Sequence, residues 1–560
     1  MDCIKTLIAG GLASLVFLTG CTAASTDDAS TTSAAGTTTV TATPTTTAAA
    51  LAANTTNHDT QADHSWDTSA EVVIDLDDPQ ATTGVSVGEG VITITKAGPY
   101  RLSGTLDDGQ VVVDIDDSGT AHLILDDASI TNRDGSAIAI TKAALAVVVL
   151  ADGTTNTLAD GTTYADTSEG AADSALDSAA NLTITGTGSL KVTGNHNDAI
   201  SSSDGLVIDG ATTEVKAVDD GIRGKDYLVV DSGTVTVVAG GDGLKSDNAE
   251  DEALGYISVG EATITVTAGG DGLDAATDVI STNGSLTVTA GGGHTATVAD
   301  DASAKALKGT ASVVVDGGTL KLDAAEDGVH SNGTVSINGG TWSIAAGDDG
   351  VHGDAAVSVT DGTVKVTTSV EGLEAAALSI SGGVVSVTAS DDGVNAAADS
   401  GEPSLTISGG KLTVDAQGDG IDVNGSITMT GGDVLVYGPT NNGNGSLDYD
   451  GSFTITGGTL VAAGSAGMAQ APSTTSAQKS LMATVNGTNG TVVQFQDSSG
   501  AVVASFTGTR AFGNVVVSNS SIAEGETYTI VVDGTVSGTT TTADAASSGM
   551  GGGPGGGRRP

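Results

Sequence analysis

The sequence has 560 residues, of which 81 are Gly, 8 are Pro and only 2% are aromatic, so a helical bundle or a conventional α/β enzyme is not expected. Its 19 Lys and Arg against 69 Asp and Glu leave a net charge of −50, which repels nucleic acids and favours cations as partners. With 38% hydrophobic residues and so few rings, any core must consist of small aliphatic side chains in thin layers, which is typical of a repeat protein.

The first 21 residues have the layout of a secretory signal. Lys5 precedes a short apolar stretch at 6–19, and the run closes on Leu-Thr-Gly-Cys at 18–21. The stretch is too short for a typical membrane span. It resembles a bacterial lipoprotein signal, which implies lipidation of Cys21 and an extracellular protein anchored to the cell membrane through lipid only. The alternative is an ordinary signal peptide followed by a Cys by chance.

Two segments have compositions that do not favour a core. Residues 22–66 consist mostly of Ser, Thr, Ala and Asp, and residues 541–560 are Gly-rich. Such sequences bury too little apolar surface to offset the entropy lost on ordering the chain. We therefore predict a disordered tether at 22–66 and a disordered tail at 541–560.

A four-residue motif recurs between about residues 180 and 465: an acidic residue, Gly, an aliphatic residue and a polar residue. One copy is Asp327-Gly328-Val329-His330. The basic step between copies is 22 residues, and some steps are longer by insertion. Each repeat also has two stretches of alternating apolar and polar residues joined by a Gly turn, a pattern that predicts β-strands.

With a third short strand after each motif, every repeat has three strands and three turns. One such coil is stable only when stacked on its neighbours, about 4.8 Å apart. We predict an all-β fold, a right-handed parallel β-helix with about 22 residues and three strands per coil. The first coils are placed at 67–180, the regular β-helix at 181–465 and a β-rich C-terminal cap at 466–540. The aliphatic residue of each motif is predicted to point into the core, and we expect a monomer.

Stacking turns the acidic position, and the acids just before it, into a crowded column. Neighbouring carboxylates at strand spacing repel by about 1 kcal/mol per pair in water. We predict that this column binds several Ca²⁺ ions, because carboxylates and turn carbonyls are hard oxygen ligands. The predicted metal ligands are Asp198, Asp219, Asp220, Asp242, Asp271, Asp327, Asp348, Asp349, Glu371, Asp391, Asp392 and Asp419.

An alternative interpretation is that each Asp merely caps its own turn, with its carboxylate solvated or partly protonated. Zinc and iron are poor candidates on sequence grounds, because the folded region lacks Cys and its few His residues do not form a ligand pair on a helix.

The column two positions after the Gly is predicted to face outward and to contact an anionic polysaccharide. Its predicted ligand-binding residues are Arg223, Lys245, Lys308, His330 and His352. The alternative is that the basic groups only offset the charge of the acidic column. We also expect the segments 246–255, 275–284 and 294–304 to form loops along one stretch of the β-helix, as walls of a binding region.

Several segments carry a resemblance to a known family. They are residues 91–104, 122–132 and 152–158, together with the Asp-Asp-Gly coils. Over about residues 70–535 the sequence resembles the bacterial carbohydrate-binding domain-containing protein family. The resemblance implies a polysaccharide-lyase-like right-handed β-helix that binds calcium and associates with acidic plant polysaccharides or cellulose. Because aromatic residues are scarce, a stacking platform for neutral sugars is not evident.

We therefore predict a surface-anchored protein that binds an acidic polysaccharide, of the polyuronate or pectin type, in a calcium-dependent manner and without catalysis. One alternative is a calcium-dependent polysaccharide lyase, in which Arg223, Lys245 or Lys308 removes a proton from a uronate whose charge is neutralised by Ca²⁺. Another is an adhesin or scaffold with a protein partner.

Overall fold

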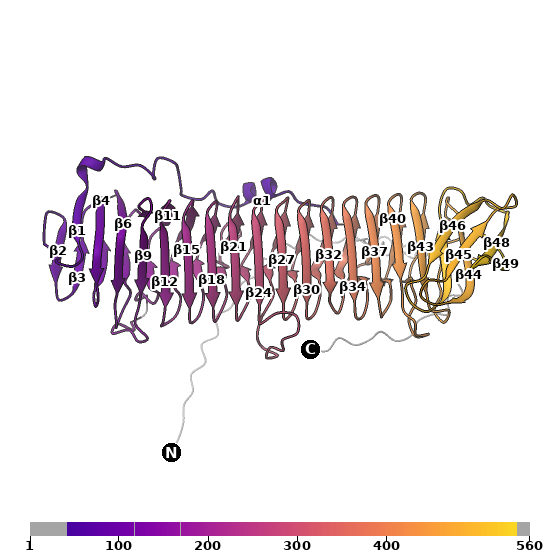
Figure 1. Cartoon of the computed structure of the whole chain (residues 1–560). Helices are drawn as coiled ribbons and strands as arrows, with labels where there is room; N and C mark the ends of the chain where they lie inside the picture. The colour runs from indigo at the N-terminus through magenta and orange to yellow at the C-terminus, as the bar shows by residue number, and fades with distance from the viewer. Residues whose placement is uncertain (1–41, 117, 169, 546–560) are drawn as a thin grey trace, which may run out of the picture. The chain divides into compact units, whose positions relative to one another are not determined.

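The structure is a computed structural model that describes residues 42–116, 118–168 and 170–545. These residues form an all-β fold, a stack of parallel coils with antiparallel strands at both ends (Figure 1). The predicted signal peptide with Cys21, the first part of the predicted tether and residues 546–560 lie outside the described residues. No helix in the described part of the chain has both the length and the apolar composition needed to cross a membrane.

Each coil contributes strands to three parallel rows. The first row contains β3 (Val91–Ile94), β5 (Gln110–Asp114), β7 (Ile138–Lys142), β10 (Leu176–Ser178), β13 (Ile200–Ser202), β16 (Ile222–Gly224), β19 (Leu244–Ser246), β22 (Leu273–Ala275), β25 (Leu307–Gly309), β28 (Val329–Ser331), β35 (Val394–Ala396), β38 (Ile421–Val423) and β41 (Asp448–Tyr449). The second row contains β1 (Val72–Asp75), β8 (Leu145–Leu150), β11 (Leu182–Gly186), β14 (Gly205–Asp209), β17 (Tyr227–Val230), β20 (Tyr256–Val259), β23 (Asp278–Ser281), β26 (Ser312–Val315), β29 (Thr334–Ile337), β36 (Ser404–Ile407), β39 (Ser426–Met429) and β42 (Phe453–Ile455).

The third row contains β9 (Thr155–Ala159), β12 (Ser189–Gly194), β15 (Thr212–Ala217), β18 (Thr234–Ala239), β21 (Thr263–Ala268), β24 (Ser285–Ala290), β27 (Thr319–Ala324), β30 (Thr341–Ala346), β32 (Thr363–Thr368), β34 (Val384–Ala389), β37 (Lys411–Ala416), β40 (Asp433–Tyr437) and β43 (Thr459–Gly464). Four long strands run through a corner and so belong to two rows. They are β4 (Gly98–Leu106), β6 (Thr120–Thr131), β31 (Val351–Val359) and β33 (Leu373–Ile380).

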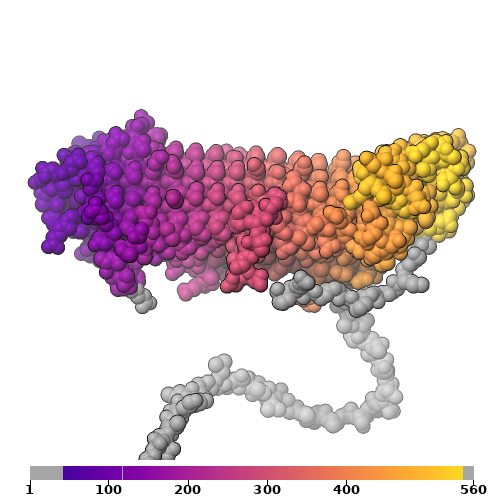
Figure 2. Space-filling model, turned by 60° about the horizontal axis from the view of Figure 1, so that its bottom comes forward, coloured from indigo at the N-terminus to yellow at the C-terminus, as the bar shows by residue number. Residues whose placement is uncertain are grey.

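Equivalent residues of successive coils stack in register, which confirms the predicted parallel β-helix. Ile200 lies beside Ile222, which lies beside Leu244. Where a coil carries an insertion the step is longer, as between Leu273 and Leu307. These aliphatic side chains are fully buried in one continuous core, as predicted. Figure 2 shows the resulting rows of side chains on the surface.

The Gly of the motif is needed because the next coil packs directly against it. A Cβ atom at Gly328 would lie 2.3 Å from Cγ2 of Ile344 and 2.7 Å from the carbonyl oxygen of Gly350. Both distances are shorter than a van der Waals contact, so a side chain here would push the coils apart.

Antiparallel strands cover both ends of the stack. At the N-terminal end β2 (Val85–Gly88) pairs with β3. At the C-terminal end β43 pairs with β47 (Phe512–Ser518), which also pairs with β44 (Ser480–Gly487). A separate sheet follows, formed by β45 (Val492–Gln496), β46 (Val502–Thr507), β48 (Thr527–Val532) and β49 (Thr535–Thr541). Such strands protect the exposed edges of a stack from pairing with other chains.

Residues 42–71, called the strap below, lie along the outer face of the second row (Figure 1). The strap contains α1 (Thr47–Ala53) and a 3-10 turn at Thr68–Ala70. The predicted disorder of residues 22–66 is therefore wrong for 42–66. The reason is that outward-facing side chains of the second row are apolar beneath the strap. Ala50 and Leu51 pack there against Val207, Tyr227, Val229, Tyr256, Ile280 and Val314.

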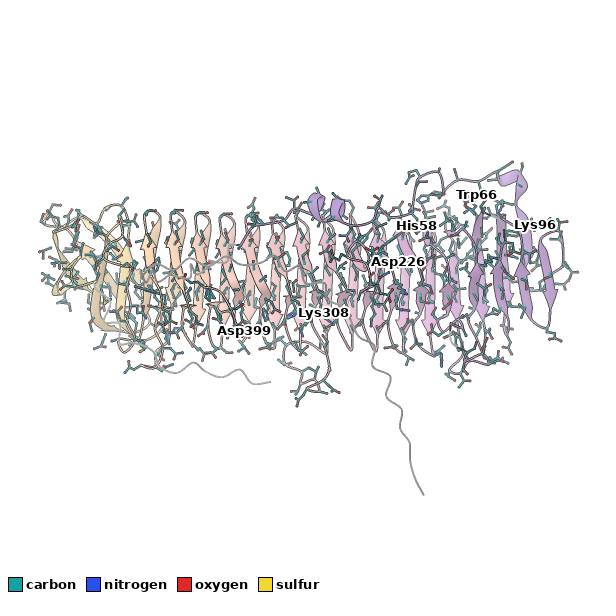
Figure 3. The ribbon with its side chains drawn as sticks, turned by 180° about the vertical axis from the view of Figure 1, so that it is seen from behind. His58, Trp66, Lys96, Asp226, Lys308 and Asp399 are labelled. Atoms are coloured by element: carbon teal, nitrogen blue, oxygen red, sulfur yellow. The ribbon has the colours of Figure 1, made fainter. Side chains whose placement is uncertain are left out.

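Polar contacts fix the register of the strap. Thr47 Oγ1 donates to Asp316 at 2.6 Å, Asn54 Nδ2 donates to Asp278 at 2.8 Å, and His58 Nδ1 lies 2.9 Å from the hydroxyl of Tyr227. Figure 3 shows His58 and Trp66 along this edge. The strap thus bridges many coils.

The insertions differ from the prediction. The expected loop at 275–284 is wrong, because it contains the regular strand β23. The segment after β19 leaves the corner between the first and second rows, whereas residues 291–306, after β24, leave the corner between the third and first rows. The latter segment projects from the stack (Figures 1 and 2). The two insertions therefore do not form a common wall.

Candidate functional site

The motif folds so that its first and fourth side chains meet on the outer surface. Asp242 Oδ2 lies 2.8 Å from Lys245 Nζ, and Asp327 Oδ2 lies 2.8 Å from His330 Nδ1. The acid stands at the corner before a first-row strand and the fourth residue stands on that strand. The two predicted columns therefore form a single surface, called the acidic face below, which runs from Asp198 to Asp422.

One oxygen of most of these Asp side chains is used by the fold. Asp198 Oδ1 accepts the backbone N–H of Asp220 at 3.0 Å, and Asp220 Oδ1 accepts that of Asp242 at 2.8 Å. The same bond to the following coil is made by Asp242, Asp271, Asp327, Asp392 and Asp419. Each Asp thus caps the next coil, and not its own turn as the alternative interpretation held. The second oxygen, Oδ2, remains to be neutralised.

Lysines supply this neutralisation in the coils between Asp220 and Lys308. Lys245 Nζ lies 3.0 Å from Asp220 Oδ2 and 2.8 Å from Asp242 Oδ2. Lys308 Nζ, labelled in Figure 3, lies 2.9 Å from Asp271 and 3.1 Å from Asp274.

Arg223 is held in the same way, by Asp247 at 2.7 Å. These contacts favour the alternative interpretation of Arg223, Lys245 and Lys308, in which the basic groups offset the acidic charge. Burial lowers the pKa of Lys245, but the carboxylates of Asp242 and Asp220 outweigh this and hold that pKa above its usual range.

Histidines replace the lysines in the next two coils. His330 Nδ1 faces Asp327 at 2.8 Å, and His352 Nδ1 faces Asp349 at 3.4 Å. The two imidazole rings are edge to face, with centroids 5.0 Å apart. Burial lowers the pKa of His352, but the carboxylates of Asp349 and Glu374 reverse the effect and raise the pKa to about 9.

Among the described residues, the acidic face from Glu371 onward lacks such counter-charges. One oxygen each of Asp392, Asp419 and Asp422 lies within 4.8 Å of the others. Within the described residues, no Lys, Arg or His forms an ion pair with these three carboxylates. Burial raises the pKa of these acids, and the charges of neighbouring carboxylates raise it further. The pKa is about 7 for Asp392 and Asp419 and about 8 for Asp422. Asp448, which pairs with Asp422 across β38 and β41, adds a fourth acid.

The predicted metal ligands are brought together only in part. Asp242 and Asp271 group with Asp274, and Asp392 and Asp419 group with Asp422. Asp327 groups with His330 and His352, and Asp349 groups with His352 and Glu374. No such group of the described residues includes Asp198, Asp219, Asp220, Asp348, Glu371 or Asp391. Asp219, Asp348 and Asp391 are exposed residues.

Sequence reasoning missed two kinds of ligand position. Asp274, Glu374 and Asp422 are fourth residues of the motif, and their spacing of three from the acid was the available signal. Asp59 and His64 of the strap meet Asp209 of β14, and no local pattern marks that encounter.

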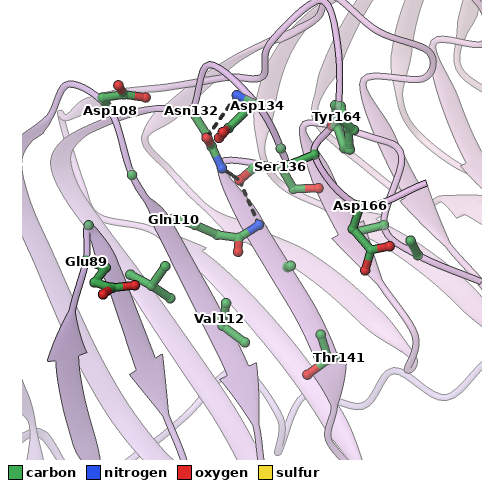
Figure 4. A pocket seen from close by; sticks show the side chains of 18 of the residues that line it. Glu89, Asp108, Gln110, Val112, Asn132, Asp134, Ser136, Thr141, Tyr164 and Asp166 are labelled. Carbon is green, nitrogen blue, oxygen red and sulfur yellow. Dashed lines mark hydrogen bonds between the residues drawn. The ribbon is translucent and has the colours of Figure 1, made fainter. Parts of the chain in front are cut away.

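A second candidate region is a pocket of about 680 Å³ near the N-terminal end (Figure 4). Gln110 Nε2 and Asn132 Nδ2 both donate to the carbonyl oxygen of Ser136, at 3.0 and 2.9 Å. Its charged lining residues are Glu89, Asp108, Asp134 and Asp166, and none of its described lining residues is basic. The pocket therefore offers acceptors to hydroxyl groups but no counter-charge to an anion.

A polysaccharide lyase-like protein from C. thermocellum, solved as a gadolinium derivative, is 30% identical to the chain. The match covers 48% of this chain and 96% of that protein, with a TM-score of 0.38. A carbohydrate-binding domain-containing protein from Acetivibrio thermocellus is 36% identical over 155 residues, which are 27% of this chain. The chain spans about half of that relative, 54% of its length.

The family comparison extends over the solenoid described above and its C-terminal strands. The sequence profile of the carbohydrate-binding domain-containing protein family matches residues 88–350 and 348–549. The matched residues include the stacked coils, the acidic face and the pocket. Because this match covers more than half of the sequence, the chain belongs to the carbohydrate-binding domain-containing protein family.

Proposed function

We propose that the chain binds an acidic polysaccharide through calcium held on the acidic face by Asp392, Asp419 and Asp422. The observation that carries this proposal is the loss of counter-charge along the column. Lysine or histidine side chains pair with the acids of the column from Asp220 to Asp349, and none does so at these three carboxylates within the described residues. Ca²⁺ takes six to eight oxygen ligands in flexible geometry. Three carboxylates leave positions that a uronate carboxylate can fill.

The geometry supports binding over the lyase alternative. A base that removes a proton must itself be unprotonated at the working pH. Lys245 and Lys308 each contact two carboxylates, and Arg223 contacts Asp247. These partners favour the charged form of each basic group, so none of the three is prepared to act as a base. The acidic pocket near Asp134 likewise suits hydroxyl groups better than uronates.

The test is retention of the full-length chain on polygalacturonate beads, with calcium and with chelator. We expect retention in calcium, loss in chelator, and loss in both conditions for the Asp419→Asn variant. Asp433→Asn, an exposed acid on the third row, is the matched control and should be retained like the wild type. Retention that ignores the chelator would overturn the calcium role. Release of unsaturated uronides, seen as ultraviolet absorbance, would instead establish a lyase.

We also propose display at the cell surface through a lipid on Cys21, on the sequence pattern alone. The Cys21→Ser variant is expected to move from the membrane fraction to the medium and to lose incorporation of labelled fatty acid. A variant that keeps its label and its membrane association would contradict this.

A further inference from the structure

The two histidines of the acidic face come from adjacent coils and stand in register. β28 and β31 pair with His330 beside His352, so the regular stacking of the solenoid fixes their separation. The residues are 22 positions apart in the sequence, where no helical spacing relates them. They are one step of the predicted repeat apart, so stacking places two members of the predicted outward column side by side as an imidazole pair.

The carboxylates around the pair are held in place by the backbone. Asp327 Oδ1 accepts the backbone N–H of Asp349 at 3.1 Å, which leaves Oδ2 directed at His330. One ligand atom from each of Asp327, His330 and His352 lies within 4.8 Å of the other two. Asp349, 3.4 Å from His352 Nδ1, supplies a second carboxylate. The donors are thus arranged before any ion arrives.

This group differs from the rest of the acidic face because it offers imidazole nitrogen as well as carboxylate oxygen. Ca²⁺ prefers oxygen ligands alone, whereas imidazole nitrogen suits Zn²⁺ and similar cations. Zn²⁺ is bound by His nitrogen at about 2.0–2.1 Å and carboxylate oxygen at about 2.0–2.2 Å, so the ligand atoms of one ion lie no more than about 4.3 Å apart. Small rotations of these side chains, whose ligand atoms lie within 4.8 Å of one another, bring them onto one ion. The His330 and His352 side chains are 15% and 21% exposed, so an ion can enter from solvent.

We propose that Asp327, His330 and His352, with Asp349 beside them, form a site for a borderline divalent cation such as Zn²⁺. This site is distinct from the calcium site proposed at Asp392, Asp419 and Asp422. An ion bound here joins two successive coils. It also stands at the boundary between the lysine-neutralised part of the acidic face and the part without counter-charges.

Isothermal titration of the full chain with ZnCl₂, in buffer that already contains calcium, tests the site. We expect one equivalent of Zn²⁺ to bind. Removal of either imidazole, in His330→Ala or His352→Ala, should weaken binding by more than the 10- to 100-fold that is typical for loss of an outer partner. Titration with Co²⁺ should give the visible absorption bands of a nitrogen-containing site.

A matched control is present on the same chain. His294 Nδ1 lies 2.8 Å from Asp323 Oδ1, the same kind of contact, but that pair has no second imidazole and belongs to none of the metal-ligating groups found among the described residues. His294→Ala should leave Zn²⁺ binding unchanged. Asp327→Asn guards against misfolding, because the amide oxygen can still accept the N–H of Asp349 while the charge is lost. It should weaken Zn²⁺ binding at an unchanged melting temperature.

Three results would each overturn the proposal. They are no zinc binding by the wild type, equal binding by the wild type and both variants of the imidazole pair, and displacement of Zn²⁺ by Ca²⁺ at equal concentration. Because no polysaccharide is present in the titration, its outcome is independent of the proposed function.

Discussion

Asp220 Oδ1 accepts the backbone N–H of Asp242, one coil further along, at 2.8 Å. This bond explains why the motif carries a short side chain with an acceptor oxygen: the carboxylate satisfies an N–H at the corner of the next coil. It also explains why the motif creates a charged surface, because each Asp that makes the bond has a second carboxylate oxygen left over. One carboxylate oxygen therefore serves the fold by accepting a backbone N–H, and the other is available to pair with a cation.

The first prediction separates the two oxygens. Asp220→Ala leaves the N–H of Asp242 without its acceptor near the surface of the core, and we expect a loss of about 1–3 kcal/mol. Asp220→Asn keeps an acceptor oxygen and should cost less, since Lys245 still has Asp242 as a partner. Chemical denaturation followed by circular dichroism measures both. The neighbouring exposed Asp219→Ala serves as control, and an equal loss in Asp219→Ala and Asp220→Ala would contradict the capping role.

The second prediction concerns calcium. A ligand that binds only the folded state stabilises it by about 2.7 kcal/mol at 100 times its dissociation constant, so calcium should raise the melting temperature of the wild type. Asp422→Asn removes one of the three proposed ligands and should abolish most of this rise. Asp433→Asn should retain it. An identical calcium response in all three proteins would show that the ions bind elsewhere.

The third prediction is that the difference in stability between the wild type and Asp419→Asn changes sign between calcium and chelator. The pKa of Asp419 is raised to about 7 by burial and then by Asp392 and Asp448, whereas an unfolded Asp titrates near 3.9. The folded state therefore holds a proton that the unfolded state has lost, and the stabilisation, complete below about pH 4, disappears as the pH rises through 7.

In chelator, wild-type stability should consequently fall between pH 5 and pH 8, values chosen on either side of the pKa of about 7 for Asp419. Asp419→Asn, which is neutral throughout, should fall less and be the more stable protein at pH 8. In calcium at pH 8 the order should reverse, because the variant lacks a ligand. Thermal melts of both proteins in both buffers are the measurement. A variant that is less stable in chelator as well would contradict the raised pKa.

The solenoid was predictable because its determinants are local and repeated. Alternation, Gly turns and the motif spacing fix which side chain of each strand enters the core, and Ile222 and Val329 are indeed buried. The columns followed from the same repeat. The division of the acidic face into lysine-paired, histidine-paired and unpaired acids did not follow from the repeat. It depends on which fourth residue, Lys245, His330 or Asp422, lies beside each acid.

The order of the strap was not predicted because the composition of a segment carries no information about the surface on which it packs. Residues 42–66 cannot form a core alone, and they are ordered by a surface made elsewhere. A signal was present in the second row, where strands such as 227–230 and 312–315 are apolar at nearly every position, unlike 404–407 and 426–429. Strands apolar on both faces indicate cover on both faces. The first pair lies beneath the strap, and beyond it outward residues such as Thr406 are exposed.

The fourth prediction tests whether the strap is held by this apolar surface. Ala50 is buried on the side of α1 that faces Ile280 and Val314, so Ala50→Asp would bury a charge and should detach the strap. A loss of about 1.4 kcal/mol in docking free energy multiplies the detached fraction by ten. Cleavage within 42–66 by a dilute protease, which tracks that fraction, should accelerate accordingly.

The same detachment should uncover Tyr227 and Tyr256, which are buried under the strap, and so increase the binding of a hydrophobic dye. The coils themselves should stay folded, because their core is a separate cluster inside the solenoid. Ala48→Asp, on the exposed side of the same helix, introduces the same charge without entering the apolar surface. If both variants were cleaved at the wild-type rate, the strap would be held by its polar contacts, such as Asn54 to Asp278, and not by burial.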